Sequence, residues 1–223
     1  MNLQEAVDAG SGTIAVIGSG GKTTLLREVA RELSAGGATV ALATSTRILP
    51  FDDLPMLTAA DEPRISEALA EHGVVCVGEP AENGKLCAPA IGFEQLAHLA
   101  DHVLVEADGS KHLPLKAHAA WEPVVPACAV RTVLVLGASG FGRRVSEAVH
   151  RPQIFCDVAG CAPDDVATPE LVACVVRAEG LADVVLVNQA ETEQAREASR
   201  RLSRLLTVPV LAGSVRDHQL EAL

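Results

Sequence analysis

The stretch Gly18-Ser19-Gly20-Gly21-Lys22-Thr23-Thr24 decides the fold of this chain. It follows an apolar run, Thr13–Ile17, and precedes an amphipathic segment that begins at Leu25. A strand, a glycine-rich turn and a helix that opens with Lys and Thr form the context of a phosphate-binding P-loop. The turn is short, because only two residues separate the first Gly from the Gly-Lys pair. The alternative interpretation is a glycine-rich turn that binds nothing.

Apolar runs alternate with helical patterns along the rest of the chain. We expect strands at Thr13–Ile17, Thr39–Ala43, Gly73–Val77, His102–Val105, Arg131–Leu136, Asp183–Val187 and Val208–Leu211. We expect helices at Lys22–Ser34, Pro63–His72, Phe93–Ala100, Pro169–Ala178 and Glu191–Leu205. This order predicts an α/β fold of the P-loop NTPase kind, with a mostly parallel sheet and helices on both faces. One nucleotide-binding domain over residues 1–223 is the economical interpretation.

Two further segments carry turn signals. Gly84, with Pro80 and Pro89 around it, indicates a turn or β-hairpin. The proline-rich segment Leu113–Pro126 predicts an extended connection that wraps the surface.

Composition narrows the class of protein. The formal net charge of −11 argues against nucleic acid or an anionic membrane as the main partner. Six cysteines without a C-x-x-C pair, and no secretory or long apolar segment, predict reduced thiols in a cytoplasmic protein. The scarcity of aromatic residues leaves Val, Leu, Ala and Ile to build the core, as in a parallel sheet buried on both faces.

The P-loop interpretation predicts a role in binding phosphate or Mg²⁺ for each residue of the loop. The backbone N–H groups of Gly18, Ser19, Gly20, Gly21 and Thr24 would surround phosphate, and Lys22 would reach the β- and γ-phosphates of ATP or GTP. The Thr23 hydroxyl would bind Mg²⁺.

Acidic residues follow the strand expected at His102–Val105. Glu106 and Asp108 are two residues apart, so their side chains point the same way along an extended chain. One carboxylate would hold Mg²⁺ and the other would act on a nucleophile, in a Walker B arrangement. Which of the two is nearer the metal stays open, and Asp108-Gly109 also fits a plain turn.

Hydroxyl groups follow the strand expected at Thr39–Ala43. Thr44 is a candidate Mg²⁺ ligand, and Thr46 and Arg47 are candidates for contacting a transferring phosphate or second substrate. The alternative is a hydroxyl-rich turn that caps a helix.

A third polar segment, Asn188-Gln189-Ala190-Glu191, follows the strand expected at Asp183–Val187. It partly matches the N-K-x-D segment with which GTPases contact guanine, so Asn188, Gln189 and Glu191 are candidates for binding the base. The alternative is a strand-to-helix turn followed by a solvated helix. The glycines of Gly137–Gly142 are spaced G-x-x-G-x-G, which predicts a flexible loop over the site and no dinucleotide-binding turn.

Taken together, these segments resemble the YqeC-like family, described as accessory proteins of selenium-dependent molybdenum hydroxylases. The resemblance lies in the P-loop, in Thr44-Ser45-Thr46, in Val105–Lys116 with its string E-A-D-G-S-K-x-L-P-L-K, in Glu122–Pro126, in Val149-His150-Arg151 and in Asn188-Gln189. It implies a nucleotide-binding protein that serves a molybdenum hydroxylase or its cofactor. The cofactor carries phosphate, so Ser110, Lys111, Lys116, His150 and Arg151 become candidates for binding an anionic second substrate.

The leading hypothesis is therefore a cytoplasmic Mg²⁺-dependent NTPase or nucleotide-dependent transferase in metallocofactor maturation. A nucleotide-gated binding protein or chaperone with slow hydrolysis is one alternative. A ligase of Mur-like chemistry, suggested by the short P-loop, is another.

Overall fold

The P-loop lies at the centre of a nine-stranded sheet in the computed structural model, which describes residues 1–7, 10–51 and 53–223. The strand order is β13-β12-β11-β9-β1-β7-β2-β4-β3, and every pairing is parallel except that of β12 with β13. The strands are β1 (Gly12–Gly18), β2 (Val40–Thr44), β3 (Met56–Leu57), β4 (Val74–Val77), β7 (His102–Glu106), β9 (Ala129–Gly137), β11 (Val184–Asn188), β12 (Val210–Ser214) and β13 (Gln219–Ala222). Two short pairs stand apart from this sheet: antiparallel β5 (Glu79–Pro80) and β6 (Leu86–Cys87), and parallel β8 (Leu115–Lys116) and β10 (Val149–His150).

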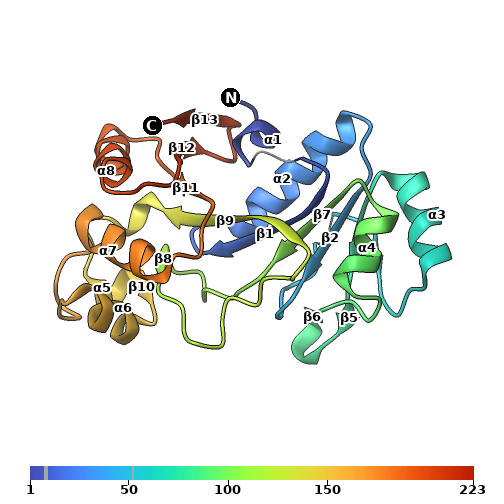
Figure 1. The fold of residues 1–223 in the computed structure, drawn as a ribbon, viewed down its shortest axis with the longest axis horizontal. Helices are drawn as coiled ribbons and strands as arrows, with labels where there is room; N and C mark the ends of the chain where they lie inside the picture. Colours follow the sequence, from blue (N-terminus) through green and yellow to red (C-terminus); the bar gives the residue numbers. More distant parts are fainter. Residues whose placement is uncertain (8–9, 52) are drawn as a thin grey trace.

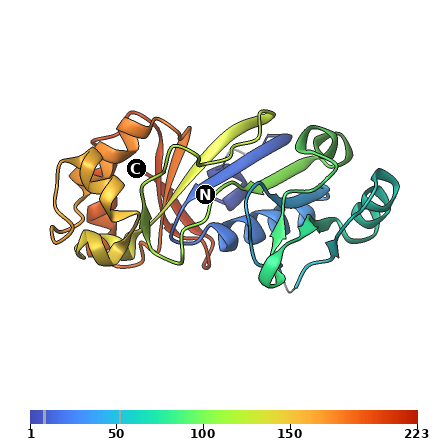
Figure 2. The same cartoon turned by 90° about the horizontal axis from the view of Figure 1, so that it is seen from below.

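Helices cover both faces of the sheet. They are α1 (Leu3–Ala6), α2 (Lys22–Ala35), α3 (Glu62–His72), α4 (Phe93–Leu99), α5 (Val145–Ala148), α6 (Pro152–Ala159), α7 (Pro169–Glu179) and α8 (Glu193–Ser203), with 3₁₀ turns η1 (Glu82–Gly84) and η2 (Ala138–Gly140). Figure 1 shows α5 to α8 gathered at one end of the molecule and α3 with α4 at the other, and Figure 2 shows the elongated shape that results. The predicted α/β fold, with a mostly parallel sheet and helices on both faces, is confirmed.

The side chains of each strand alternate between the two faces of the sheet, and each face packs against a layer of helices. Ile14 and Val16 of β1 pack in a core with α1 and α2, whereas Ala15 and Ile17 face a second core with α6, α7 and α8. A third core joins β2, β4 and β7 to α3 and α4. Side chains of a strand point alternately to opposite faces, so the nearly continuous apolar runs are buried on both sides.

The seven expected strands are all present, with bounds shifted by a few residues. Helix α7 begins at the expected residue and ends one residue later than expected. The Thr168 hydroxyl accepts a hydrogen bond from Leu171 N at its start, and Gly180 adopts a left-handed conformation at its C-terminus. The hairpin around Gly84 is the β5–β6 pair.

The expectation for Leu113–Pro126 was wrong in part. Leu115 through Ala119 are buried, and β8 pairs with β10 in register Leu115↔Val149. Leu115 and Ala117 join the core around α6 and α7, which holds this stretch inside the protein. Only its later part, with Trp121 and Val124 exposed, runs along the surface.

Strand register brings the polar segments to one edge of the sheet. Val16 of β1 pairs with Glu106 of β7, and Glu106 pairs in turn with Thr44 of β2. Gly18 pairs with Val135 of β9, and Gly137 pairs with Asn188 of β11. Because the strands are parallel, their carboxyl ends meet where open α/β sheets bind ligands.

The P-loop lies so close to the end of β9 that only glycine fits. Gly20 has a φ of +82°, and a Cβ atom there would lie 2.3 Å from the backbone nitrogen of Gly137. A side chain would therefore collide with backbone that cannot move without shifting β9.

Gly20→Ala should lower the free energy of unfolding by about 1–3 kcal/mol, because the new methyl group meets backbone at both Gly137 and Leu136. Gly37→Ala is the matched control, since Gly37 has a φ of +92° but open space around it. Urea unfolding of both variants measures the difference. Equal losses would assign the whole effect to backbone conformation and none to close packing of the loop.

Candidate functional site

The P-loop presents a row of free backbone donors. Within the described residues, the backbone N–H groups of Gly20 through Thr24 donate no hydrogen bond. These groups stand at the N-terminus of α2, where the helix dipole favours an anion. The Ser19 hydroxyl is also buried without a hydrogen-bond partner among the described residues. The loop is thus built to accept negatively charged oxygens.

Lys22 lies beneath this loop. It is only 4% exposed, and its ammonium donates to the Gly18 carbonyl oxygen over 2.7 Å. The Asp108 carboxylate lies 3.1 Å away, that of Glu106 3.7 Å and the Ser110 hydroxyl 3.4 Å. Lys22, Glu106, Asp108 and Ser110, all candidates from the sequence, therefore meet at one point.

Asp108 is the most heavily contacted carboxylate in this group and is fully buried. One of its oxygens, Oδ2, accepts a hydrogen bond from Gly18 N over 2.9 Å. The same oxygen lies 3.0 Å from Lys116 Nζ and 2.8 Å from His118 Nε2. Burial alone would raise the pKa of Asp108, but the His118 hydrogen bond and the two lysine charges outweigh it and lower the pKa to about 2.

Glu106 has a different environment. Its pKa is raised by burial, which Lys22 and Thr23 offset only in part. The exposed Thr23 donates its hydroxyl hydrogen to Glu106 Oε2 over 2.9 Å. Of the two acids, Glu106 is therefore the one beside the candidate metal-binding threonine.

Thr44 is buried at the end of β2, and its hydroxyl is already in use. It donates to the Glu106 carbonyl oxygen over 2.8 Å and accepts from Thr46 N over 3.0 Å. Thr44 thus fixes the main chain of Glu106 instead of reaching outward. Arg47 is 62% exposed and lies 3.7 Å from Glu82, beside the β5–β6 hairpin.

Lys116, a candidate for binding an anionic second substrate, lies inside the protein. Its side chain is fully buried, donates to the Gly109 carbonyl oxygen over 2.7 Å and lies 3.1 Å from Glu122. Glu122 also accepts from Arg151 Nε over 2.6 Å, and the Arg151 guanidinium lies 5.2 Å from the ring centre of Trp121. The charge of Lys116 is therefore balanced inside the protein.

Three expected anion-binding residues do remain at the surface around this group. Lys111 is exposed, and His150 and Arg151 are partly exposed. Burial and the positive charges of Lys116, Arg151 and Lys111 lower the pKa of His150. Lys111, His112 and Arg151 all have positive φ values, between 49° and 66°, which marks strained backbone at this spot.

Sequence reasoning missed His118 and Glu179. His118 Nδ1 lies 2.7 Å from Glu179 Oε2, and its backbone N–H donates to the other Glu179 oxygen. Burial opposes protonation of His118, but hydrogen bonds to Asp108 and Glu179 raise its pKa. A chain of contacts thus runs from Lys22 through Asp108 and His118 to the end of α7. The alternation of Leu115 and Ala117 with Lys116 and His118 is the signal that would have suggested a buried strand.

Asn188 contacts the P-loop from the other side. Its amide nitrogen donates to the Gly20 carbonyl oxygen over 2.9 Å, and its amide oxygen accepts from Val215 N over 3.0 Å. The side chain is 6% exposed, so it supports the loop in this conformation. Gln189 and Glu191 are exposed, and the Gln189 amide accepts from the Ser139 hydroxyl over 2.8 Å.

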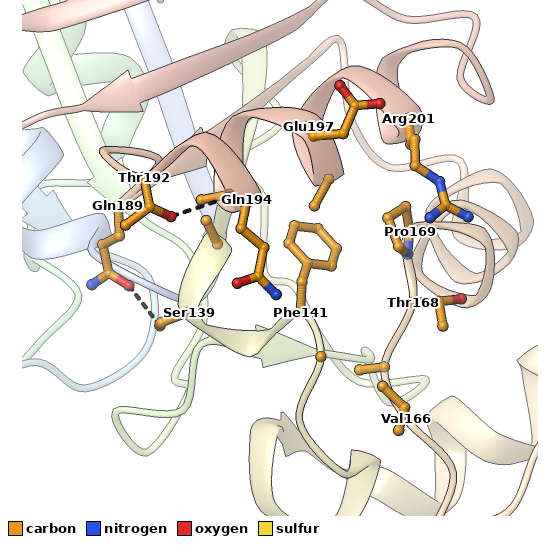
Figure 3. A pocket seen from close by; sticks show the side chains of 15 residues that line it. Ser139, Phe141, Val166, Thr168, Pro169, Gln189, Thr192, Gln194, Glu197 and Arg201 are labelled. Carbon is orange, nitrogen blue, oxygen red and sulfur yellow. Dashed lines mark hydrogen bonds between the residues drawn. The ribbon is translucent and has the colours of Figure 1, made fainter.

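A cavity of about 570 Å³ opens beside Gln189, between η2 and α8 (Figure 3). Phe141 projects into it, and Ser139, Thr168 and Arg201 stand around it. The loop Gly137–Gly142, expected to lie over the site, begins at Gly137 beside Gly20 of the P-loop and continues as one wall of this cavity. No residue of the P-loop lines the cavity.

No three His, Cys, Asp or Glu side chains among the described residues are grouped so as to hold a metal ion. In the same part of the chain, no helix is long and apolar enough to cross a membrane.

Comparison with known proteins identifies the family of this chain. Residues 14–153 match the family described as YqeC protein. The chain is 34% identical over 175 residues to a protein of Escherichia coli (strain K12) named "Uncharacterized protein YqeC", covering 75% of this chain and 68% of that one. This chain belongs to the YqeC family.

The residues matched to the YqeC family contain the P-loop, both acids, Lys116, His118 and Arg151, whereas Glu179 and Asn188 lie beyond them. Among solved structures, the chain is similar to the signal recognition particle 54 kDa protein from Aeropyrum pernix K1 in complex with GDP. The TM-score is 0.44 at 14% identity, and the alignment covers 100% of this chain and 46% of that chain.

In this YqeC-family protein, Asp108→Asn should lower the free energy of unfolding by about 3–5 kcal/mol, because it removes the carboxylate closest to both buried lysines and leaves Lys22 with only Glu106, at 3.7 Å, and Lys116 with only Glu122. Asp164→Asn is the control, since the Asp164 side chain is 83% exposed in its pair with Arg144 and should cost less than about 0.5 kcal/mol. Urea unfolding at neutral pH compares the two.

The pH dependence tests the same interaction. The pKa of Asp108 falls from 3.8 to about 2 on folding, so its contribution of about 2 kcal/mol is present above pH 3.8 and is lost as the pH falls toward 2. Stability of the wild type should therefore drop more steeply across this window than that of Asp108→Asn. Parallel pH profiles would contradict the role given to Asp108.

Proposed function

We propose that this YqeC-family protein binds a Mg²⁺–nucleoside triphosphate, ATP or GTP, at Gly18–Thr24, and acts as a hydrolase or nucleotide-dependent transferase. The observation that carries the proposal is the row of free N–H groups from Gly20 to Thr24 above the buried ammonium of Lys22. An anion-binding loop of this kind, at the end of a central parallel strand, suits a polyphosphate.

Thr23 and Glu106 fit the requirements of Mg²⁺. They offer a hydroxyl and a carboxylate oxygen 2.9 Å apart, and hard oxygen ligands of this type are what the ion prefers. When bound, the ion would neutralise charge on the phosphates. Thr44 supports this pair indirectly by holding the main chain of Glu106.

Lys22 would contact the phosphates, and Asp108 would position Lys22. The Asp108 carboxylate is enclosed by Gly18 N, Lys22, Lys116 and His118. We therefore assign it to the support of the site and not to contact with a second substrate.

The surface next to this group suits an anionic second substrate. Lys111, His150 and Arg151 are at least partly exposed and lie within electrostatic reach of one another. By family resemblance, we propose that the partner is a selenium-dependent molybdenum hydroxylase or its phosphate-bearing cofactor, and that the protein serves its maturation.

Lys22→Ala should weaken triphosphate binding by about 3 kcal/mol, or on the order of 100-fold in Kd, because it removes a charged donor from the phosphates. Lys85→Ala, at an exposed lysine of the β5–β6 hairpin, is the matched control and should bind as the wild type does. Titration calorimetry with ATP and GTP in the presence of Mg²⁺ measures both. Equal affinities of Lys22→Ala and wild type for the triphosphate would contradict the assignment of the nucleotide site to this loop.

Glu106→Gln should keep metal-free nucleotide binding and lose most of the gain in affinity that Mg²⁺ provides, because the amide is a poorer ligand than the carboxylate. The same titrations with and without Mg²⁺ give the result. If Mg²⁺ strengthens binding equally in wild type and variant, Glu106 does not serve the metal.

A strain that lacks this protein should still make the hydroxylase polypeptide but leave it inactive, and Lys22→Ala should not restore it, because the role requires nucleotide. Activity, molybdenum and selenium content of the purified hydroxylase are the measurements. Full activity and selenium content in the deletion strain would end the maturation proposal while leaving the nucleotide site intact.

A phosphate-release assay distinguishes the two reaction classes. Phosphate release by the protein alone supports a hydrolase, and release only with an added substrate supports a transferase.

A further inference from the structure

Three of the six cysteines gather where α6 ends and packs against α7. Cys156 is in α6, Cys161 follows that helix, and Cys174 is in α7. The sulfur atoms of Cys156 and Cys161 lie 3.7 Å apart, and Cys174 Sγ lies 3.7 Å from the Val158 carbonyl oxygen. All three thiols are free.

The turn at the end of α6 explains the close approach. Gly160 adopts a left-handed conformation, and the Cys161 N–H donates back to the Cys156 carbonyl oxygen over 3.2 Å. In this type of helix ending, the residue after the turn packs against the last helical turn, usually through apolar side chains. Here the two side chains that meet are both thiols.

We propose that Cys156 and Cys161 form a reversible dithiol–disulfide site that reacts with low-molecular-weight disulfides. Cys161, the more exposed of the two, attacks as thiolate one sulfur of oxidised glutathione, forming a mixed disulfide and releasing one glutathione thiolate. The Cys156 thiolate then attacks the Cys161 sulfur, forming the protein disulfide and releasing the second glutathione. The oxidant accepts two electrons, and the two protons lost by the cysteines end on the two glutathione thiols.

The other cysteines lack this geometry. Cys76 is fully buried, and burial raises the pKa of its thiol to about 12. Cys128 Sγ donates to the Thr13 hydroxyl over 3.5 Å. Among the described residues, Cys156, Cys161 and Cys174 are not arranged so as to hold a metal ion. The separation of 3.7 Å between the sulfur atoms of Cys156 and Cys161 suits exchange between two adjacent thiols.

The site has two structural connections. Arg151 caps the start of α6, and the segment after Cys161 leads to Val166, Ala167 and Thr168 on the wall of the cavity in Figure 3. A Cys156–Cys161 bond would tie the last turn of α6 to that segment.

Equilibration of the full-length protein with oxidised and reduced glutathione, followed by acid trapping, tests the proposal. The free thiol count of the wild type should fall from six to four, with loss of the mass of two hydrogens. Peptide mapping should place the bond between Cys156 and Cys161, and excess reduced glutathione should restore both thiols. Cys156→Ser should instead retain one glutathionyl group on Cys161, because no thiol remains to displace it.

Cys128→Ser is the matched control and should form the same bond as the wild type. A wild type that keeps all six thiols, holds a stable glutathione adduct, or bonds Cys174 in place of either partner would overturn the proposal.

The rate at which the disulfide forms gives a second test. Burial and the Cys156 hydrogen bond raise the pKa of Cys161 to about 11, so bond formation should accelerate about tenfold per pH unit between roughly pH 8 and 10. A rate independent of pH would exclude Cys161 as the attacking thiol.

Discussion

The site depends on one buried carboxylate, that of Asp108. An isolated charge at a fully buried position is very costly, so the surrounding chain has to supply partners in fixed places. Those partners come from the end of β1, from the first residue of α2 and from the stretch after β8 that carries His118. Because Glu179 holds His118 from the end of α7, the P-loop is tied to a helix on the opposite face of the sheet from α2.

The surroundings of Asp108 and Glu106 shift the pKa values of these two acids in opposite directions. Asp108 gathers several donors and its pKa is lowered, whereas Glu106 is buried with fewer compensating contacts and its pKa is raised. Environments that push two pKa values apart separate the tasks of the two groups. Asp108 supplies a permanent negative charge inside the protein, and Glu106, next to the exposed Thr23, is the acid whose charge a bound cation would favour.

The sequence indicated most of the sheet, because long apolar runs alternate with helical patterns, and this alternation predicts parallel strands buried on both faces. It also indicated that Lys22 meets Glu106 and Asp108, since Glu106 ends, and Asp108 closely follows, a strand that pairs with β1. The short elements β3, β8, β10 and β13 were missed because two to four residues carry little periodic signal. The contact of His118 with Glu179 joins positions 61 residues apart, and no local pattern encodes such a pairing.

The loop is held from both sides before any ligand arrives. Asp108 accepts from Gly18 N at its start, and Asn188 donates to the Gly20 carbonyl oxygen further along. A donor row that is already fixed binds an anion without the entropic cost of ordering the loop. Lys22 has to exchange a contact, and its hydrogen bond to the Ser110 hydroxyl, at 3.4 Å, is weaker than the one of 2.7 Å to the Gly18 carbonyl oxygen. In the proposed function, a phosphate oxygen would take that place while Gly18 and Asp108 keep their contacts with the ammonium. The lysine proposed to bind the anion would then stay positioned by the buried carboxylate that organises the site.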